Sequence, residues 1–232
     1  MDAVFLLPLA LLGAVVGLDV VSFPQAMVSR PIVAATLAGA MTGSVVRGLL
    51  LGAILELFAL EMLAVGASRY PEWGSASVVG GALYSSGVLA SPDGGALVVA
   101  VAAALITAWL GGWSMYLHRK VNGYFARRSL PRLDRGSSGA VIGLQLTGLT
   151  LDLVRGGLLT LLVLLVSIPL GQLVARHWGL DAQTTRAVVL AVATAAAGGA
   201  AWRLFHGTGG ARWWFVGGLT AGIALLLLFA AE

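Results

Sequence analysis

Residues 156–175 read GGLLTLLVLLVSIPLGQLVA, a run of twenty residues without one charged side chain. A helix needs about 20 mostly apolar residues to cross the hydrocarbon core of a bilayer. This run therefore predicts a transmembrane helix. Apolar runs of comparable length predict further membrane-spanning helices at residues 3–21, 45–67, 96–117 and 213–230.

The composition agrees with this prediction. Apolar residues make up 59% of the 232 positions, charged residues make up 10%, and the mean hydropathy is +0.94. Soluble proteins carry about 25% charged residues, so this chain has too few charges to cover a water-facing surface. We expect an integral membrane protein and exclude a soluble enzyme. The net charge of +4 comes from basic residues between apolar runs, where they orient a membrane protein and do not indicate nucleic-acid binding.

Three further apolar segments are too short or too polar to span easily. Residues 31–43 read PIVAATLAGAMTG, residues 75–90 contain several serines, and residues 187–202 are a borderline run of alanine and valine. Short, interrupted apolar segments are typical of re-entrant hairpins, which protein or a water-filled cavity must cover. The predicted fold class is therefore an all-α integral membrane protein. We expect a polytopic helical bundle with short re-entrant hairpin segments, forming one membrane-embedded domain over residues 1–232.

Glycine is abundant, with 32 residues, and several glycines recur at four-residue spacing. Lipid provides no hydrophobic drive between helices, so small residues that let backbones approach become packing positions. Each pair is a weak signal of a helix contact. The pairs are Gly13/Gly17, Gly39/Gly43, Gly48/Gly52, Gly139/Gly143 and Gly218/Gly222.

One long polar stretch, residues 118–135, reads HRKVNGYFARRSLPRLDR. Its basic residues predict a cytoplasmic loop by the positive-inside rule. Membrane orientation is sufficient to explain the charges and is the favoured interpretation. The alternative is a docking surface for an acidic cytoplasmic partner. Against the single acid Asp134 stand Arg119, Lys120, Arg127, Arg128, Arg132 and Arg135.

The adjoining segment 138–155 is predicted to be a helix with one polar face. Gln145, Gly148, Asp152 and Arg155 follow a helical spacing, with leucines elsewhere. Asp152 and Arg155 are close enough to pair. A helix at the membrane interface, or against a partner, is favoured over a substrate contact.

Glu56 lies in the middle of a predicted membrane helix, on one stripe with Gly48 and Gly52. A carboxylate at such a position nearly always faces the bundle interior or a water-filled cavity. Two roles are equally compatible with this placement: contact with a ligand, or a buried hydrogen-bonded clasp between two helices.

Residues 19–31 read DVVSFPQAMVSRP, and their two prolines interrupt any helix. This places four polar residues on irregular backbone between apolar segments: Ser22, Gln25, Ser29 and Arg30. Neutral and acidic hydrogen-bonding groups in a concave, partly dry site suit a polyhydroxylated ligand. An ordinary interfacial loop is the alternative.

The search for catalytic chemistry is negative. The three histidines His118, His177 and His206 do not have metal-ligand spacing, and the chain contains no cysteine. The sequence predicts no catalytic residue, no metal site and no cofactor.

Three stretches together resemble a known family. Residues 18–39 read LDVVSFPQAMVSRPIVAATLAG, residues 48–60 read GLLLGAILELFAL, and residues 65–72 read VGASRYPE. They are similar to the mannose/sorbose family of phosphotransferase-system enzyme IIC subunits. The resemblance is strong over residues 18–90 and looser in segment order beyond them. Residues 24–28 differ from the mannose transporter of that family, so mannose itself is not implied.

The resemblance implies a multi-pass sugar permease in the bacterial cytoplasmic (inner) membrane. Such subunits work with a membrane IID subunit, and cytoplasmic IIA and IIB phosphocarriers phosphorylate the incoming sugar. The family assembles as trimers of IIC–IID pairs and is thought to move a transport domain in an elevator manner. By position, Gln25 and Glu56 are implied as the leading sugar contacts, with Ser22 and Arg30 as supporting residues.

Two other functions remain open at this point. One is a carrier or channel that works without phosphorylation. The other is a sensor or scaffold that keeps the fold and uses the basic segment to bind a IIB-like protein. The presence or absence of genes for IIA, IIB and IID partners beside this one would discriminate among the three.

Overall fold

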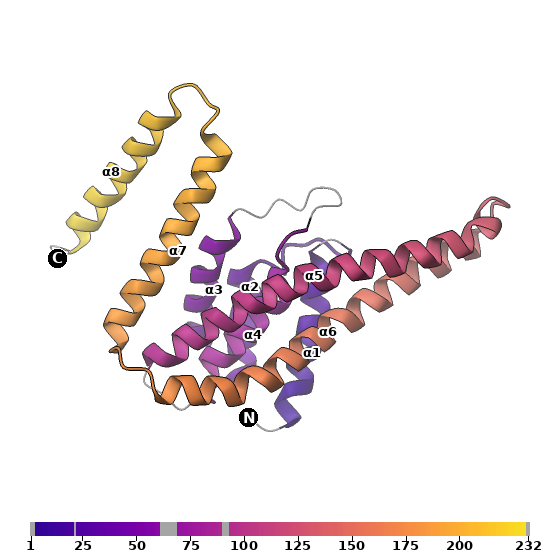
Figure 1. The fold of residues 1–232 in the computed structure, drawn as a ribbon, viewed down its shortest axis with the longest axis horizontal. Helices are drawn as coiled ribbons and strands as arrows, with labels where there is room; N and C mark the ends of the chain where they lie inside the picture. The colour runs from indigo at the N-terminus through magenta and orange to yellow at the C-terminus, as the bar shows by residue number, and fades with distance from the viewer. Residues whose placement is uncertain (1–2, 21, 61–68, 90–92, 231–232) are drawn as a thin grey trace.

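The computed structural model describes residues 3–20, 22–60, 69–89 and 93–230. Helices are the only regular elements in these ranges, as an all-α membrane protein requires. Figure 1 shows a central group of short helices, a long two-helix arm and a peripheral helical hairpin. The elements are α1 (Ala3–Asp19), α2 (Pro31–Thr42), α3 (Val45–Ala59), α4 (Trp73–Ser85), α5 (Asp93–Leu133), α6 (Ser138–Arg176), α7 (Ala182–Phe205) and α8 (Ala211–Ala230).

Three of the described helices are long and apolar enough to cross a bilayer: α5, α6 and α7. Large apolar side chains on the outer face of α6, such as Leu162 and Leu173, are more than half exposed and suit a lipid surface. The chain is thus a multi-pass membrane protein. The borderline run at 187–202 turns out to lie in a helix of 24 residues, α7, because flanking polar residues extend it at both ends.

The expected span at 45–67 is wrong over its described part. The helix α3 has 15 residues and ends at Ala59, which gives a length of about 22 Å at 1.5 Å per residue. This is shorter than a hydrocarbon core of about 30 Å. Residues 61–68 lie outside the described residues.

The segment at residues 31–43 forms a short helix that turns back into α3, and its re-entry into the membrane from one side stays a prediction. The helix α2 has 12 residues, a length of about 18 Å, and begins at Pro31, whose fixed φ suits the first helical position. It ends at Gly43, whose φ of 111° is a conformation that favours glycine. The chain then reverses into α3, which Ser44 caps by accepting a hydrogen bond from the Arg47 N–H.

The helix α4 is the centre of the structure, and all thirteen of its residues are buried. Its sequence, WGSASVVGGALYS, is built mainly from small residues that let neighbouring backbones approach. A Cβ atom on Gly81 would lie 2.7 Å from the carbonyl oxygen of Ala35 in α2, and one on Gly80 would lie 3.2 Å from the carbonyl oxygen of Ala100 in α5.

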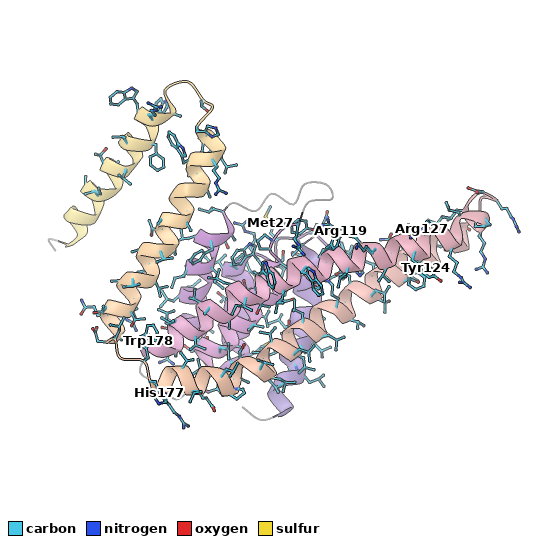
Figure 2. All side chains as sticks on the ribbon, viewed as in Figure 1. Met27, Arg119, Tyr124, Arg127, His177 and Trp178 are labelled. Carbon is cyan, nitrogen blue, oxygen red and sulfur yellow. The ribbon has the colours of Figure 1, made fainter. Side chains whose placement is uncertain are left out.

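The helices α5 and α6 continue past the central group as a long antiparallel arm (Figure 1). The basic stretch at 118–135 was expected to be a loop, and this expectation is wrong. Residues up to Leu133 continue α5, which has 41 residues, and the reversal occurs at Gly136 with a φ of 73°. Half of the residues in this basic stretch, namely the arginines, lysine, leucines and alanine, are good helix formers, and α6 packs beside α5. Figure 2 shows Arg119, Tyr124 and Arg127 following one another along this arm.

The helices α7 and α8 form a hairpin at the opposite side of the molecule from the arm tip (Figure 1). Between them lies an apolar cavity of about 610 Å³ lined by Trp202, Phe205, Trp214 and Phe215. The described side chains of α8 are almost all exposed. Lipid or a protein partner therefore surrounds this helix in the membrane.

The glycine spacing identified some helix contacts and not others. The pair at 48 and 52 is in the α2–α3 contact, where a Cβ atom on Gly48 would lie 2.5 Å from the Ala35 carbonyl oxygen and 2.9 Å from the Gly39 Cα atom. By contrast, a Cβ atom on Gly143 would meet nothing within 4 Å. Glycine therefore serves close packing in the central helices and has no such role at Gly143, toward the tip of the arm.

This difference gives a paired test. Gly48→Ala places a methyl group against backbone that cannot move aside, and overpacking of this kind costs about 1–3 kcal/mol. The variant should melt at a lower temperature than the wild-type protein in the same detergent or nanodisc. Gly143→Ala, the control, should melt at or above the wild-type temperature because alanine favours helix. Equal melting temperatures for the two variants would contradict the packing described above.

Candidate functional site

The segment between α1 and α2, residues 20–30, is an irregular loop organised by Asp19. This carboxylate is 2% exposed and accepts three hydrogen bonds from the loop. The Ala26 N–H donates to Oδ1 at 2.7 Å, and the N–H and hydroxyl of Ser29 donate to Oδ2 at 2.9 Å and 2.8 Å. Asp19 therefore satisfies backbone groups that no secondary structure pairs.

Two residues of this loop have unusual backbone angles. Gln25 and Met27 have φ values of 60° and 62°, in the left-handed region that side chains normally avoid. Such conformations cost about 1–3 kcal/mol each and persist only where surrounding contacts impose them. The bonds to Asp19 lie on either side of Met27, at Ala26 and Ser29, and the first of them directly follows Gln25, so they supply such contacts. Backbone strain of this kind is common at ligand sites.

Glu56 of α3 reaches across to the beginning of α2. It forms an ion pair with Arg30, and its Oε2 atom accepts a hydrogen bond from the Ile32 N–H at 3.2 Å. Arg30 precedes α2 and offers no side-chain cap, so Glu56 pairs one of the unsatisfied N–H groups at the start of that helix. The side chains remain 38% exposed for Arg30 and 21% exposed for Glu56. The pair is thus a helix clasp that still faces an open side.

Ser22 is held by a different element. Its hydroxyl donates to Oδ2 of Asp152 in α6 at 2.5 Å, across 130 positions of sequence. Asp152 is fully buried and accepts from Nε of Arg155 at 2.8 Å. The Nη1 atom of Arg155 in turn donates to the Ser114 hydroxyl in α5 at 3.1 Å. This polar cluster joins the loop to both helices of the arm.

The four residues expected at the sugar site therefore do not all contact one another in the structure. Arg30 and Glu56 are in contact. Ser22 contacts the Asp152 cluster, and Gln25 is exposed on the loop between them. The Asp152–Arg155 pairing expected from the sequence is confirmed, and its contact with Ser22 was not expected.

Sequence reasoning also missed two buried acids. Asp19 directly follows an apolar run and precedes serines and prolines, a signal that it binds loop backbone. Glu72 is fully buried at the beginning of α4, where its side chain accepts from the Ser75 N–H at 3.0 Å. Glutamate is not among the residues preferred at this capping position, so the sequence carried no clear signal of this role.

The basic residues of the arm contact aromatic rings in several places. The Arg119 guanidinium lies 5.2 Å from the ring centre of Tyr70, and the Lys120 ammonium lies 4.4 Å from that of Tyr116. Cation–π contacts at exposed sites are worth about 0.5–1 kcal/mol. The Arg119–Tyr70 contact joins α5 to the segment that precedes α4, whereas the Lys120–Tyr116 contact lies within α5.

A groove of about 670 Å³ runs beside Ser22 between α5 and α6, bordered by His118, Asn122 and Gln145. Its size falls within the range of about 300–1,000 Å³ typical of ligand sites. Among the described residues, no cluster of acids and histidines has the arrangement needed to hold a metal ion.

Comparisons with known proteins agree on one family. A family model described as "PTS system sorbose-specific iic component" matches residues 3–178. A protein of Bacillus subtilis (strain 168) described as "Fructose permease IIC component" is 28% identical over 168 residues. The aligned region is 72% of this chain and 60% of that permease, so the chain spans less than two thirds of the relative's length.

Two solved structures are similar over 100% of this chain. One, described as "Structure of membrane protein", has a TM-score of 0.73 at 18% identity and is covered to 94%. The other, "CryoEM Structure of Mannose Transporter ManYZ and Microcin E492 (MceA) complex", has a TM-score of 0.60 at 17% identity and is covered to 96%. At these identities the similarity concerns the fold.

The role of Asp19 can be tested directly. Asp19→Ala removes the acceptors for Ala26 and Ser29, and each buried donor left unsatisfied costs about 1–3 kcal/mol. Amide hydrogen exchange across residues 22–30 should become faster. Asp181→Ala, which removes an acceptor of the Thr184 N–H at the exposed start of α7, is the control and should leave these residues unchanged. Unchanged exchange in the Asp19 variant would show that the loop does not depend on this carboxylate.

Proposed function

The chain belongs to the sorbose-specific IIC family of the phosphotransferase system, within the mannose/sorbose group, and we propose that it is the sugar-translocating membrane subunit of such a system. In this proposal the sugar crosses through this subunit and receives its phosphoryl group from a partner IIB protein. The chain supplies binding and passage. The phosphoryl chemistry belongs to the partners.

The observation that carries the proposal is the exposed ion pair beside the strained loop. A carboxylate has about four lone-pair sites, and Glu56 uses its two oxygens for Arg30 and the Ile32 N–H. It can therefore accept sugar hydroxyls in addition, while the guanidinium of Arg30 donates to others. Gln25, with an amide that both donates and accepts, projects from the same loop. A planar acceptor, a planar donor and an amide together suit a neutral polyhydroxylated molecule.

The partners proposed are those of the family. A membrane IID subunit would cover exposed apolar surface of the outer helices, in a trimer of IIC–IID pairs or another trimeric assembly. The basic end of the arm would face the cytoplasm, where IIB operates. The relative's description as a fructose permease and the mannose transporter of similar fold suggest hexoses as the first substrates to examine.

Uptake by membrane vesicles tests the proposal. The chain is expressed with its IID, IIB and IIA partners, and vesicles are given labelled D-fructose, D-mannose or L-sorbose with a phosphoryl donor. We expect one sugar to accumulate as its phosphate only when this chain is present. Accumulation of the free sugar without IIB would instead identify a carrier, and no accumulation of any of the three would contradict the proposal.

Glu56→Gln should weaken sugar binding. The substitution keeps the shape of the side chain and removes the charge-assisted bonds, which are about twice as strong as neutral ones. We expect a loss of about 1.5–3 kcal/mol, or roughly 10- to 150-fold in affinity, with the IID complex still assembled.

The matched control for this variant is Asp134→Asn at the exposed arm tip, which should bind sugar normally. Affinity and melting temperature should be measured on the same purified complexes. A Glu56→Gln complex with wild-type affinity and a lowered melting temperature would restrict Glu56 to its structural role as a helix clasp.

A further inference from the structure

The buried ion pair of α6 contacts the proposed sugar site at one point. Asp152 is 0% exposed and the Arg155 side chain is 8% exposed. Neither side chain can reach a sugar in the loop, because protein atoms cover both. Their connection to the site is the hydrogen bond from the Ser22 hydroxyl to Asp152.

The charges in this cluster are fixed in place by their contacts. Burying an ion pair carries a desolvation cost, and good geometry with further hydrogen bonds is required to offset it. Asp152 has both oxygens engaged, one by Ser22 and one by Arg155. Arg155 is anchored to α5 through Ser114, whose own hydroxyl donates to the Gly111 carbonyl oxygen at 2.8 Å. The carboxylate therefore presents a fixed acceptor to the loop.

The first part of the loop is mostly exposed. Ser22 borders the groove between α5 and α6, and the next three residues, Phe23, Pro24 and Gln25, are exposed. Asp19 holds the second part of the loop, at Ala26 and Ser29, and Glu56 holds its end at Arg30. Asp152 is the carboxylate that holds the first part, at Ser22, and Gln25 lies between this contact and those of Asp19.

We propose that Asp152, held by Arg155, is a positioning residue for sugar binding: it fixes Ser22 and thereby places Gln25 for the ligand. This inference rests on the proposed function and adds a role for a residue that does not touch the sugar. In this proposal the Ser22–Asp152 hydrogen bond couples the loop after α1 to the helix α6 of the arm.

A positioning role makes a specific kinetic prediction. Misplacing the loop weakens binding of the sugar in all states alike, which raises KM and leaves the maximal uptake rate nearly unchanged. Ser22→Ala removes the contact and should raise KM about tenfold, the effect expected from losing one hydrogen bond to a charged group. Asp152→Asn leaves Ser22 only a neutral hydrogen bond and should raise KM by a smaller factor. Because both substitutions act on the same contact, the double variant should match Ser22→Ala alone and should not show the product of the two effects.

Controls separate positioning from general destabilisation. Thr220→Ala removes a side-chain hydrogen bond to the Val216 carbonyl oxygen on the exposed helix α8, outside the Asp152 cluster, so its KM should stay within about twofold of wild type. Ser22→Thr keeps the hydroxyl and should restore most of the affinity. Amide exchange across residues 22–30, measured without sugar, should be faster in Ser22→Ala and unchanged in Thr220→Ala.

The outcomes distinguish the two proposals. Wild-type uptake with an unchanged KM in Asp152→Asn would overturn the positioning role and leave the transport function intact. Multiplicative effects in the double variant would also overturn it, because Ser22 would then act on the sugar independently. If Asp152→Asn does not fold, unchanged loop exchange in Ser22→Ala overturns the proposal by itself. Wild-type complexes that accumulate none of the three sugars contradict the proposed function, and the exchange measurement still decides whether Asp152 fixes the loop.

Discussion

This structure depends on one constraint: polar backbone groups inside the membrane must find hydrogen-bond partners where water is scarce. Irregular backbone at membrane depth is tolerated only where protein or a water-filled cavity satisfies its polar groups. This chain has several short helices, and each interruption exposes such groups. Acidic side chains satisfy them: Asp19 binds the loop after α1, Glu56 binds the start of α2, and Glu72 caps α4. The acids that stabilise the fold are therefore close to the irregular backbone at which we propose that the sugar binds.

Close glycine packing connects this constraint to the site. Because Gly48 and Gly52 let α3 approach α2 to backbone contact, the next residue on the same stripe, Glu56, is brought against the beginning of α2. A larger residue at either glycine would separate the helices and remove Glu56 from Arg30 and Ile32. The arm makes the corresponding connection from the other side, through Asp152 and Ser22. The site is thus assembled from three elements that are distant in sequence.

Much of the architecture could be predicted from the sequence, because apolar length and proline placement are local properties. These properties predicted an integral membrane protein, a short segment at 31–43 and an irregular loop at 19–31. The stripe of Gly48, Gly52 and Glu56 predicted which face of α3 packs against another helix. The partners of the acids could not be predicted, since the contact of Asp152 with Ser22 depends on tertiary packing across 130 residues. The helical arm was not predicted because a run of basic residues is compatible with a loop and with a helix alike.

The central claim is that a sugar binds at the loop held between Asp19, Glu56 and Asp152. A cryo-EM map of the complete complex with its transported sugar tests this claim most directly. The account predicts sugar density within hydrogen-bonding distance of Glu56 or Arg30, with Gln25 beside it and Asp152 bonded to Ser22 behind the loop. Sugar density elsewhere in the membrane region, with no contact to residues 22–30 or to Glu56, would contradict it.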